Sequence, residues 1–282
     1  MALSILNNIP SLVAENNLNI TNQNLQKTLF RLSSGSRINS GADDAAGLAI
    51  ADGLEANTTA LTQSAQNASN GVGALQVADG ALAQVTTLLN RAVTLATEAS
   101  TGTVSSAQRG ALDAEFTQIK AEIDRIGSTT TFNGTSVFSA TTTSIFLSDA
   151  SSTSQIGVTV GTLSSAAITD GSGANSVNIS SDSLTGATGA NAQTALGHID
   201  TAIANVASIR GSVGAGINRL QSAVNVINNQ VQNLTSAEDG IRAADIPAEV
   251  ANLSRFTILN QSGISALAQA NSAQQSVLNL LR

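Results

Sequence analysis

A heptad pattern of apolar residues runs along the C-terminal half of the chain. Its positions alternate in steps of three and four, and Arg210 is the one member that is not apolar. The pattern comprises Leu196, Ile199, Ile203, Val206, Arg210, Val213, Ile217, Leu220, Val224, Ile227, Val231 and Leu234. Because this spacing places every member on one face of an α-helix, we predict a single helix over residues 196–234, about 58 Å long.

The glycine-rich stretch GSVGAG, residues 211–216, conflicts with this helix. Each glycine costs about 1 kcal/mol relative to alanine in a helix interior. The heptad phase continues across the stretch, which favours one helix with a weak point. Two helices separated by a break are the alternative.

Further heptad seams lie elsewhere in the chain. One comprises Leu75, Ala78, Leu82, Val85, Leu89, Ala92 and Ala96; another, after the break STGTVSSAQRG, comprises Leu112, Phe116, Ile119, Ile123 and Ile126. Near the two ends the repeats are Leu18, Leu25, Leu29 and Leu32, and Ile264, Leu267, Leu278 and Leu281, with Asn271 and Gln274 in phase between them. Neither end can bury its apolar stripe alone, so we expect the two ends to pair.

A zone of different character, residues 129–191, separates the helical regions. It is rich in Ser, Thr, Gly and β-branched residues, and SIFLSD and QIGVTVGTL alternate as strands do. Asn133-Gly134 suits a tight turn, and residues 164–191 are expected to form a loop or short hairpin on the surface. We therefore predict a mainly α fold: a rod-like bundle of long antiparallel heptad-patterned helices, a small central β-hairpin region, and paired N- and C-termini.

Composition supports long, thin seams in place of a compact core. The 282 residues include no Cys, Trp or Tyr, six Phe and one His, whereas compact cores usually contain aromatic residues. The formal charge is −7; residues 1–50 are neutral and residues 241–282 carry +1, so the middle holds −8. A chain without a basic surface is not expected to bind nucleic acid, and the neutral ends suggest burial against something.

Neither a secretory signal peptide nor a membrane span is expected. MALSILNNIPSLVAENN lacks a positively charged start, and Asn and Pro interrupt its apolar run. No stretch approaches the roughly 18 uninterrupted apolar residues of a membrane span. We therefore expect no membrane insertion.

The candidate chemical motifs are weak. The single histidine, His198, excludes a His-rich metal cluster and lies at a polar position of the long helix. Asp43 and Asp44 follow the turn Asn39-Ser40-Gly41, but neighbouring helical residues point about 100° apart, so they cannot form a catalytic dyad. We expect both carboxylates to cap a helix start, followed by a small-residue packing face, AAGLAI. No catalytic, cofactor-binding or metal site is expected.

The terminal seams are expected to need a partner. Burying a Leu or Ile contributes about 1.5–3 kcal/mol, so the eight terminal residues would contribute of order 12–24 kcal/mol. Ordering some 40 residues at each end costs far more, at about 1–2 kcal/mol per residue. We therefore expect both ends to be disordered in a free monomer and to fold when neighbouring copies cover them.

Several motifs resemble bacterial flagellin. They are GSRINSGADDAAGLAIADGL (35–54), EIDRIGSTTTFNG (122–134), ANLSRFTILNQSGISALAQANSAQQSVLNLL (251–281), the starting MALSILNN and EDGIRAADIPAE (238–249). The resemblance covers roughly residues 1–140 and 195–282. It implies a secreted, extracellular structural subunit, exported without a cleaved signal peptide, that polymerises into the filament of the bacterial flagellum.

The resemblance also implies a division of the chain and a set of partners. Residues 1–45 and 241–282 would be the two arms of an inner-tube coiled coil; residues 46–140 and 195–240 would form a helical rod domain; residues 141–194 would be a small β-hairpin region without large outer domains. The implied partners are further copies of the chain, an export chaperone, and filament cap and hook-associated proteins. Packing between subunits is expected at Leu18, Leu25, Leu29, Leu32, Ile264, Leu267, Leu278 and Leu281.

Innate immune receptors are further partners implied by the resemblance. LNRAVTLA and DAEFTQ align with the region that a vertebrate Toll-like receptor recognises in many flagellins, and Arg91, Leu95 and Glu115 match contact positions. Residues 30–51 match the epitope of the plant flagellin receptor. Solvated helix charges are the alternative interpretation of Arg91 and Glu115.

Three rival functions are a hook–filament junction protein of the same family, a secreted adhesin or coiled-coil adaptor, and an enzyme. The terminal motifs favour flagellin over the junction protein, and the lack of any catalytic site argues against an enzyme.

Overall fold

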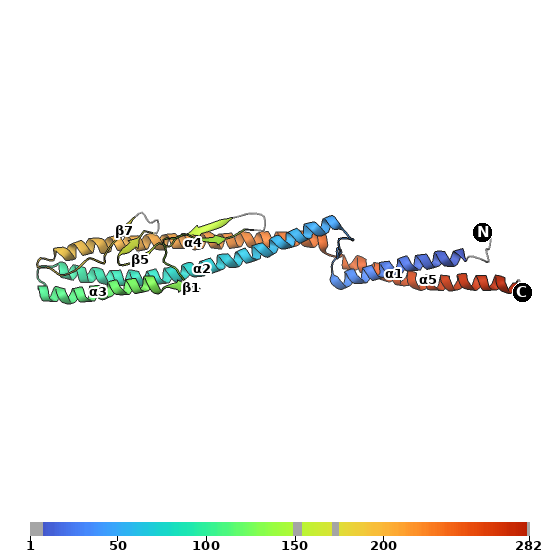
Figure 1. Ribbon diagram of the computed structural model, residues 1–282, viewed down its shortest axis with the longest axis horizontal. Helices are drawn as coiled ribbons and strands as arrows, with labels where there is room; N and C mark the ends of the chain where they lie inside the picture. The colour runs from blue at the N-terminus through green and yellow to red at the C-terminus, as the bar shows by residue number, and fades with distance from the viewer. Residues whose placement is uncertain (1–7, 149–153, 171–174, 281–282) are drawn as a thin grey trace. The chain divides into compact units, whose positions relative to one another are not determined.

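The computed structural model describes residues 8–148, 154–170 and 175–280, and it confirms a mainly α fold with a small β region (Figure 1). Five long helices account for most of this part of the chain: α1 (Ile9–Ser34), α2 (Ala45–Ser100), α3 (Ser106–Thr129), α4 (Ala190–Arg242) and α5 (Ile246–Leu280). All of the strands found in it lie between residues 131 and 177.

The chain divides into two compact units. One contains Met1–Ala56 and Asn233–Arg282, here called the terminal unit, and the other contains Asn57–Gln232, here called the rod unit. The five-segment division expected from the sequence, with boundaries after residues 45, 140, 194 and 240, stays a prediction.

Helices α2, α3 and α4 lie side by side in the rod unit (Figure 1). The heptad seam of α2 forms the centre of this bundle, since each of its seven predicted members, from Leu75 to Ala96, is buried. Phe116, Ile119 and Ile123 of the α3 seam are buried as well, while Leu112 and Ile126 at its ends are half-buried. Small and medium aliphatic side chains thus fill a long, narrow core, as the composition suggested.

The buried residues of α4 match the predicted seam at only some of its positions. Five of its members are buried: Ile199, Val206, Val213, Leu220 and Ile227. The alternate members Ile203, Arg210 and Ile217 are half-buried or exposed, and Ala202, Ile209 and Gly216 take their places in the core. Between residues 202 and 216 the buried face is therefore shifted by one residue at every second position, and Gly216 lets α4 approach Leu75 of α2 closely.

Gly216 shows why the glycine-rich stretch does not break the helix. A Cβ at this position would lie 3.2 Å from Cδ1 of Leu75 in α2 and 3.4 Å from Val158. Helix α4 is continuous from Ala190 to Arg242, so the prediction of one helix is confirmed and the alternative of two helices is wrong. At Gly216, glycine provides close packing between elements.

The first two hairpins follow the sequence pattern. Strands β1 (Thr131–Phe132) and β2 (Thr135–Ser136) are joined by Asn133 (φ 50°) and Gly134 (φ 76°). Two consecutive residues at positive φ characterise the type I′ turn that Asn-Gly favours. Strands β3 (Thr143–Phe146) and β4 (Gln155–Val158) pair antiparallel, as the alternation in SIFLSD and QIGVTVGTL predicted.

The described residues of the segment 164–191, which are 164–170 and 175–191, are more ordered and more buried than predicted. Strands β5 (Leu163–Ser164), β6 (Ala167–Thr169) and β7 (Ser176–Val177) form a three-stranded antiparallel sheet. Ile168, Ile179 and Leu184 are fully buried. The prediction of a surface loop or short hairpin therefore missed the three-stranded sheet and its buried side chains. A few apolar residues among many small polar ones are enough to anchor the segment.

Charged residues of α3 hold this segment in place. The Asp124 carboxylate accepts hydrogen bonds from the Ser165 amide (2.6 Å) and hydroxyl (2.8 Å), and Asp113 accepts from the Leu184 amide (2.6 Å). Between them, Lys120 Nζ donates to the carbonyl oxygens of Ser180 (3.2 Å) and Asp182 (2.6 Å). Backbone groups that strands leave unpaired thus find partners on α3.

Candidate functional site

Exposed large apolar side chains are concentrated on the terminal unit. Twelve of them belong to it: Ile9, Leu12, Val13, Ile20, Leu29, Phe30, Ile50, Ile246, Val250, Ile258, Leu259 and Ile264. The described part of the larger rod unit exposes three: Val77, Phe146 and Val226. Clustered exposed apolar surface of this kind marks an interaction site.

The predicted packing residues line this surface to different degrees. Leu18, Leu25, Leu32 and Leu267 are half-buried, so they contribute to the contact between α1 and α5. Leu29 and Ile264 are 48% and 54% exposed, which leaves them free to contact another molecule. Leu278 belongs to α5, but its side chain is not among those described, and Leu281 lies outside the described residues.

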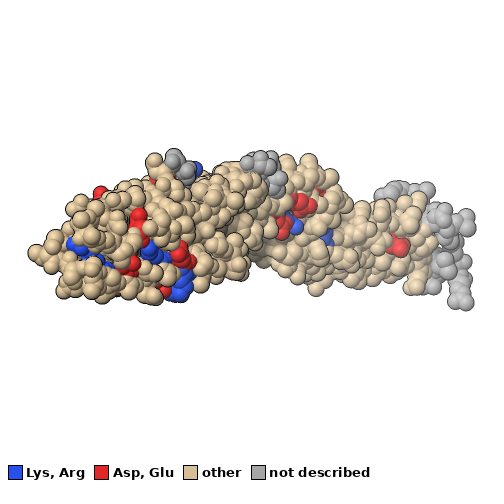
Figure 2. Space-filling view, turned by 60° about the vertical axis from the view of Figure 1, so that its left-hand side comes forward, with Lys and Arg blue, Asp and Glu red and all other residues tan. Residues whose placement is uncertain are grey.

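Few charges interrupt the apolar surface of α1 and α5. Over the described lengths of these two helices the charged residues are Glu15, Lys27, Arg31, Glu249 and Arg255. Figure 2 shows the corresponding region, at the right of the view, as mostly tan, in contrast to the red and blue clusters on the rod unit. A surface with so little charge is poorly suited to remain in water and well suited to burial.

Helices α1 and α5 pair antiparallel, which confirms the expected pairing of the ends. Contacts that lie early in α1 fall late in α5: Ser11 meets Asn271, Leu18 meets Gly263, and Arg31 meets Glu249. A Cβ on Gly263 would lie 3.2 Å from Cδ1 of Leu18, so a small residue permits close approach there. In α1 only Thr28 is buried among the described side chains, so this pair has little interior of its own.

Polar side chains bridge the two helices at three levels. Ser11 Oγ donates to Asn271 Oδ1 (3.0 Å), and the Asn22 and Asn260 amides are hydrogen-bonded to each other. Arg31 Nη1 lies 3.1 Å from Glu249 Oε1. The sequence placed Asn271 in phase with the seam, but it gave no sign of the partners across the pair, because Asn and Ser recur throughout the chain.

Asp43 and Asp44 have different structural roles. Asp44 caps α2, with its Oδ1 accepting from the Gly47 amide at 2.9 Å, as predicted. Asp43 does not cap the helix; it lies 2.6 Å from Lys27 Nζ of α1, and this ammonium is the main cause that lowers the Asp43 pKa to about 2. The expectation that both carboxylates cap is therefore wrong for Asp43, because a closer cation is available.

The segments that leave α1 and α4 are joined to each other. Ser36 and Ala243 form an antiparallel bridge, with the Arg37 amide donating to the Arg242 carbonyl oxygen (2.7 Å) and the Ala244 amide donating to that of Gly35 (2.9 Å). Gly35 ends α1 at φ 70°, a left-handed conformation that glycine adopts without strain. The base of the α1–α5 pair is thus fixed by backbone hydrogen bonds.

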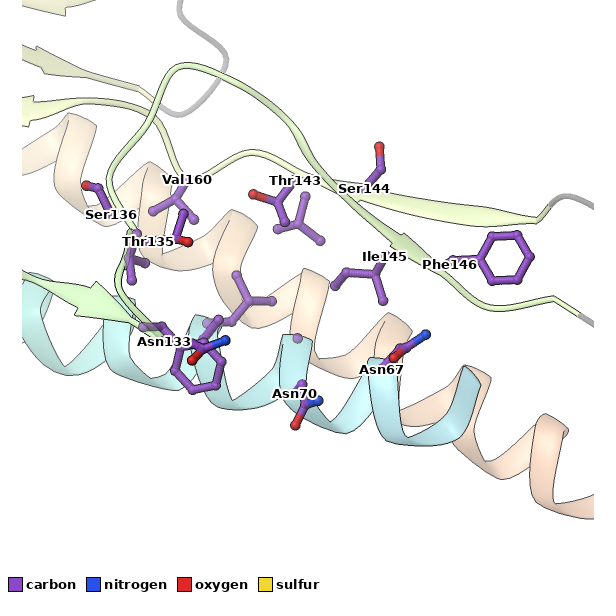
Figure 3. Close-up of a pocket in the computed structure, with 16 residues that line it drawn as sticks. Asn67, Asn70, Asn133, Thr135, Ser136, Thr143, Ser144, Ile145, Phe146 and Val160 are labelled. Carbon is purple, nitrogen blue, oxygen red and sulfur yellow. The ribbon is translucent and has the colours of Figure 1, made fainter. Parts of the chain in front are cut away.

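One hollow in the described rod unit has no charged side chain in its lining. This groove of about 730 Å³ lies between α2 and the hairpins β1–β2 and β3–β4, and its lining includes the polar Asn67, Asn70 and Asn133 and the apolar Ile145 and Val160 (Figure 3). Without a charged side chain or a histidine in its lining, the groove offers no general acid or base to activate its Ser and Thr hydroxyls. His and acidic side chains form no metal-holding group among the described residues.

The residues aligned with a receptor contact fall into two classes. Arg91 and Glu115 form an exposed bidentate ion pair between α2 and α3, with N–O distances of 2.7 and 3.0 Å. Leu95 is 1% exposed and packs in the core. A direct receptor contact at Leu95, as expected from the sequence, therefore does not fit this arrangement. The single histidine, His198, has its Nδ1 2.9 Å from an Asp182 carboxylate oxygen and forms an ion pair or hydrogen bond there.

Helix α2 meets the length and composition of a membrane span. It contains an 18-residue window with a mean hydropathy of 1.2, of which 28% is buried. Core helices pass the same test, and the seven buried seam residues of α2 account for its apolar character by packing in the core of the rod unit. The expectation of no membrane insertion stays a prediction.

Two family models match the chain. The model described as the bacterial flagellin N-terminal helical region matches residues 5–143, and the bacterial flagellin C-terminal helical region matches residues 196–281. Together they include all five helices except the first residues of α4. The unmatched residues 144–195 contain most of the strands.

Full-length relatives show the same likeness. A flagellin of Halalkalibacterium halodurans is 36% identical over 278 residues, and flagellin FlaB2 of Treponema pallidum is 34% identical over 289 residues, each alignment covering 99% of both chains. Among solved structures, a crystal structure of Bacillus cereus flagellin is similar with a TM-score of 0.46 at 30% identity, covering 61% of this chain and 94% of that one.

Proposed function

Since the chain belongs to the bacterial flagellin family and is a structural subunit of the flagellar filament, we propose that the paired helices α1 and α5 are the surface through which its subunits pack. The concentration of exposed apolar side chains on the terminal unit carries this proposal. In a homopolymer each copy presents the same surface, so apolar stripes left open on one subunit are covered by its neighbours.

The energetics favour this role for the pair. Covering one exposed Leu or Ile contributes about 1.5–3 kcal/mol, and several such residues lie on each subunit. Three of the five charged residues on α1 and α5 are in ion pairs, Lys27 with Asp43 and Arg31 with Glu249, so burial would not leave these three charges without partners. The proposed packing residues are the predicted set from Leu18 to Leu32 and from Ile264 to Leu281.

The family likeness also supports a route and partners for the subunit. We propose export through the flagellar secretion channel, with a chaperone that holds the C-terminal segment and a cap complex at the filament tip. The same apolar surface would need protection before assembly, which gives the chaperone a physical purpose. Binding of purified chaperone to the full chain, measured with and without residues 246–282, tests this part.

Receptor binding is a second candidate function, favoured by the exposed Arg91–Glu115 pair. Animal receptor contact would occur at these two side chains, with Leu95 supporting them from beneath, and residues 30–51 would be the plant epitope. The test is binding of Arg91→Ala to an immobilised receptor ectodomain. Arg125→Ala, which breaks the exposed Arg125–Glu122 pair on α3, is the matched control and is expected to bind as the parent does.

Seeded growth tests the packing surface. Purified full-length chain is added to short filament fragments, and electron microscopy measures elongation. We expect the parent and Leu29→Met to elongate seeds, and Leu29→Asp to fail, because it places an unpaired carboxylate in a buried contact. The circular dichroism of Leu29→Asp should match that of the parent, since Leu29 is outside the rod unit. Filaments grown from Leu29→Asp at the parent's rate would refute the proposal.

A further inference from the structure

The three polar bridges between α1 and α5 are regularly spaced along α5. Their α5 members, Asn271, Asn260 and Glu249, follow one another at intervals of eleven residues. Eleven residues are about three helical turns, so all three lie on the same face of α5. Polar pairs therefore recur along a seam whose other members are apolar.

We propose that these three pairs fix the register in which α1 packs against α5, and that they exclude slipped pairings of these two similar apolar helices during filament assembly. This inference rests on the proposed function, because it concerns how the packing surface is built. The members on α1 are Ser11, Asn22 and Arg31. Because these three side chains are polar, they do not contribute to the apolar packing surface of α1 and α5.

Hydrogen-bonding groups are suited to this task because they discriminate. Apolar side chains pack against one another in many registers with little change in free energy, whereas a polar group opposite an apolar one loses its hydrogen bond. Asn22 and Asn260 are both half-buried, so water only partly replaces a lost partner. Such positions are known to specify register at some cost in stability.

Slipped pairings of α1 and α5 would each lose a specific polar contact. A slip of seven residues, which keeps the heptad phase, places Asn22 opposite Leu253 or Leu267 according to its direction. A slip of eleven residues places Asn22 opposite Glu249 or Asn271, both polar, but it separates Arg31 from Glu249. The amide pair thus opposes the first error, and the ion pair opposes the second.

The bridge between Ser36 and Ala243 fixes the register at one end of the pair only. The Asn22 and Ser11 bridges lie progressively farther from it along α1. If the backbone bridge alone set the register, the amides could be replaced without consequence. This alternative is what the experiment must separate from the proposal.

A disulfide reports the register directly because the chain contains no cysteine. A Cβ on Gly263 would lie 3.9 Å from the Leu18 Cβ, within the range of native disulfides. The parent for the test is therefore the full chain with Leu18→Cys and Gly263→Cys, grown on seeds and then oxidised. The yield of intrachain disulfide is read on a non-reducing gel and confirmed by peptide mass spectrometry.

We expect the disulfide to form in nearly all subunits of the parent and to fall at least twofold when Asn22→Leu and Asn260→Leu are added. Asn24→Leu with Gln269→Leu adds the same apolar side chains at exposed positions of the same helices and is expected to leave the yield unchanged. Arg31→Glu should lower the yield, and Arg31→Glu with Glu249→Arg should restore it. Restoration by charge exchange is not expected of a merely structural role.

A second measurement applies if the two cysteine substitutions themselves prevent elongation of seeds. The rate of elongation is then compared between two chains without cysteine, Asn22→Leu with Asn260→Leu and the control Asn24→Leu with Gln269→Leu. Elongation at least twofold slower in the first chain is expected, because slipped subunits cannot add to the seed. Equal rates in the two chains would overturn the register inference.

The outcomes separate the two proposals. If neither the unmodified chain nor any variant elongates seeds, the proposed function is wrong. If the double-leucine variant at Asn22 and Asn260 elongates seeds and keeps the parent's disulfide yield, the register inference is overturned and the proposed function stands.

Discussion

Arg109 Nε donates a 2.8 Å hydrogen bond to the carbonyl oxygen of Ala99, the penultimate residue of α2. Its other nitrogens donate to the carbonyl oxygens of Thr101, Gly186 and Ala187, and the side chain is 2% exposed. No carboxylate is among these partners. The positive charge lies at the C-terminal end of α2, where the helix dipole is negative, and it ties that end to the segment before α4.

Replacing this guanidinium should destabilise the rod unit strongly. Arg109→Met leaves the buried carbonyl oxygen of Ala99 and three partly buried carbonyl oxygens without this donor, and we expect the free energy of unfolding to fall by at least about 3 kcal/mol. Urea unfolding of the full-length monomer, followed by circular dichroism, measures the change. Arg125→Met on the same helix removes an exposed pair with Glu122 and is expected to cost less than about 1 kcal/mol. Equal losses for the two variants would contradict the role assigned to Arg109.

Glycines within α4 should respond in opposite directions to added side chains. Gly211→Ala has no atom within 4 Å of the new Cβ, so we expect a gain in unfolding free energy approaching about 1 kcal/mol from helix propensity. Gly216→Val forces atoms against Leu75 and Val158, and we expect a loss of about 1–3 kcal/mol. Urea midpoints of the two variants measure the contrast. If both substitutions stabilise the chain, α4 has room for a larger side chain at Gly216 and the proposed close packing there is wrong.

Helices α2 and α4 show why predictions from the sequence succeeded or failed. All seven predicted members of the α2 seam, from Leu75 to Ala96, are buried, whereas Leu95, which is buried beside them, lay outside the predicted seam. Helix α4 offers two neighbouring stripes, and burial follows the one with Ala202 and Gly216, since α2 must approach closely there. Periodicity ranks stripes by hydrophobicity and treats glycine as a defect, so it cannot rank them by how closely a partner helix approaches.

The candidate surface could be located from sequence, but its polar contacts could not. Terminal heptads identify apolar faces that need partners. The pairing of Asn22 with Asn260 depends on the relative placement of residues 238 positions apart, and local patterns carry no such information. The same holds for Asp43, whose ion pair with Lys27 overrode the capping role that its place before α2 indicated.

Acid should selectively remove the contribution of the Lys27–Asp43 pair. The pKa of Asp43 is lowered to about 2 from 3.8, so its carboxylate stabilises the folded state above pH about 4, and this contribution is lost as the pH falls toward 2. Filaments of Asp43→Asn lack it at every pH. We expect the parent to resist urea better than this variant at pH 5–7, and the difference to narrow as the pH falls to 2 and to vanish below it.

Sedimentation of filaments after urea treatment at each pH measures this difference. Asp44→Asn is the matched control, because asparagine caps a helix as well as aspartate does and Asp44 has no ion pair with Lys27 in the structure. It should follow the parent across the whole range. A difference between parent and Asp43→Asn that persists unchanged at pH 2 would show that the ion pair is not its source.

Trypsin should distinguish the terminal unit before and after assembly. Lys27, Arg31 and Arg255 lie on α1 and α5, which bury little of their own surface, and the chain entropy of both ends favours disorder in a free monomer. We expect rapid cleavage after these residues in monomers and protection in filaments. Arg125, exposed on the well-packed α3, serves as the internal reference and should be cut slowly in both forms. Mass spectrometry of the fragments over time identifies each site. If Lys27 and Arg255 resist trypsin in the monomer as long as Arg125 does, the terminal pair is stable alone and assembly is not what orders it.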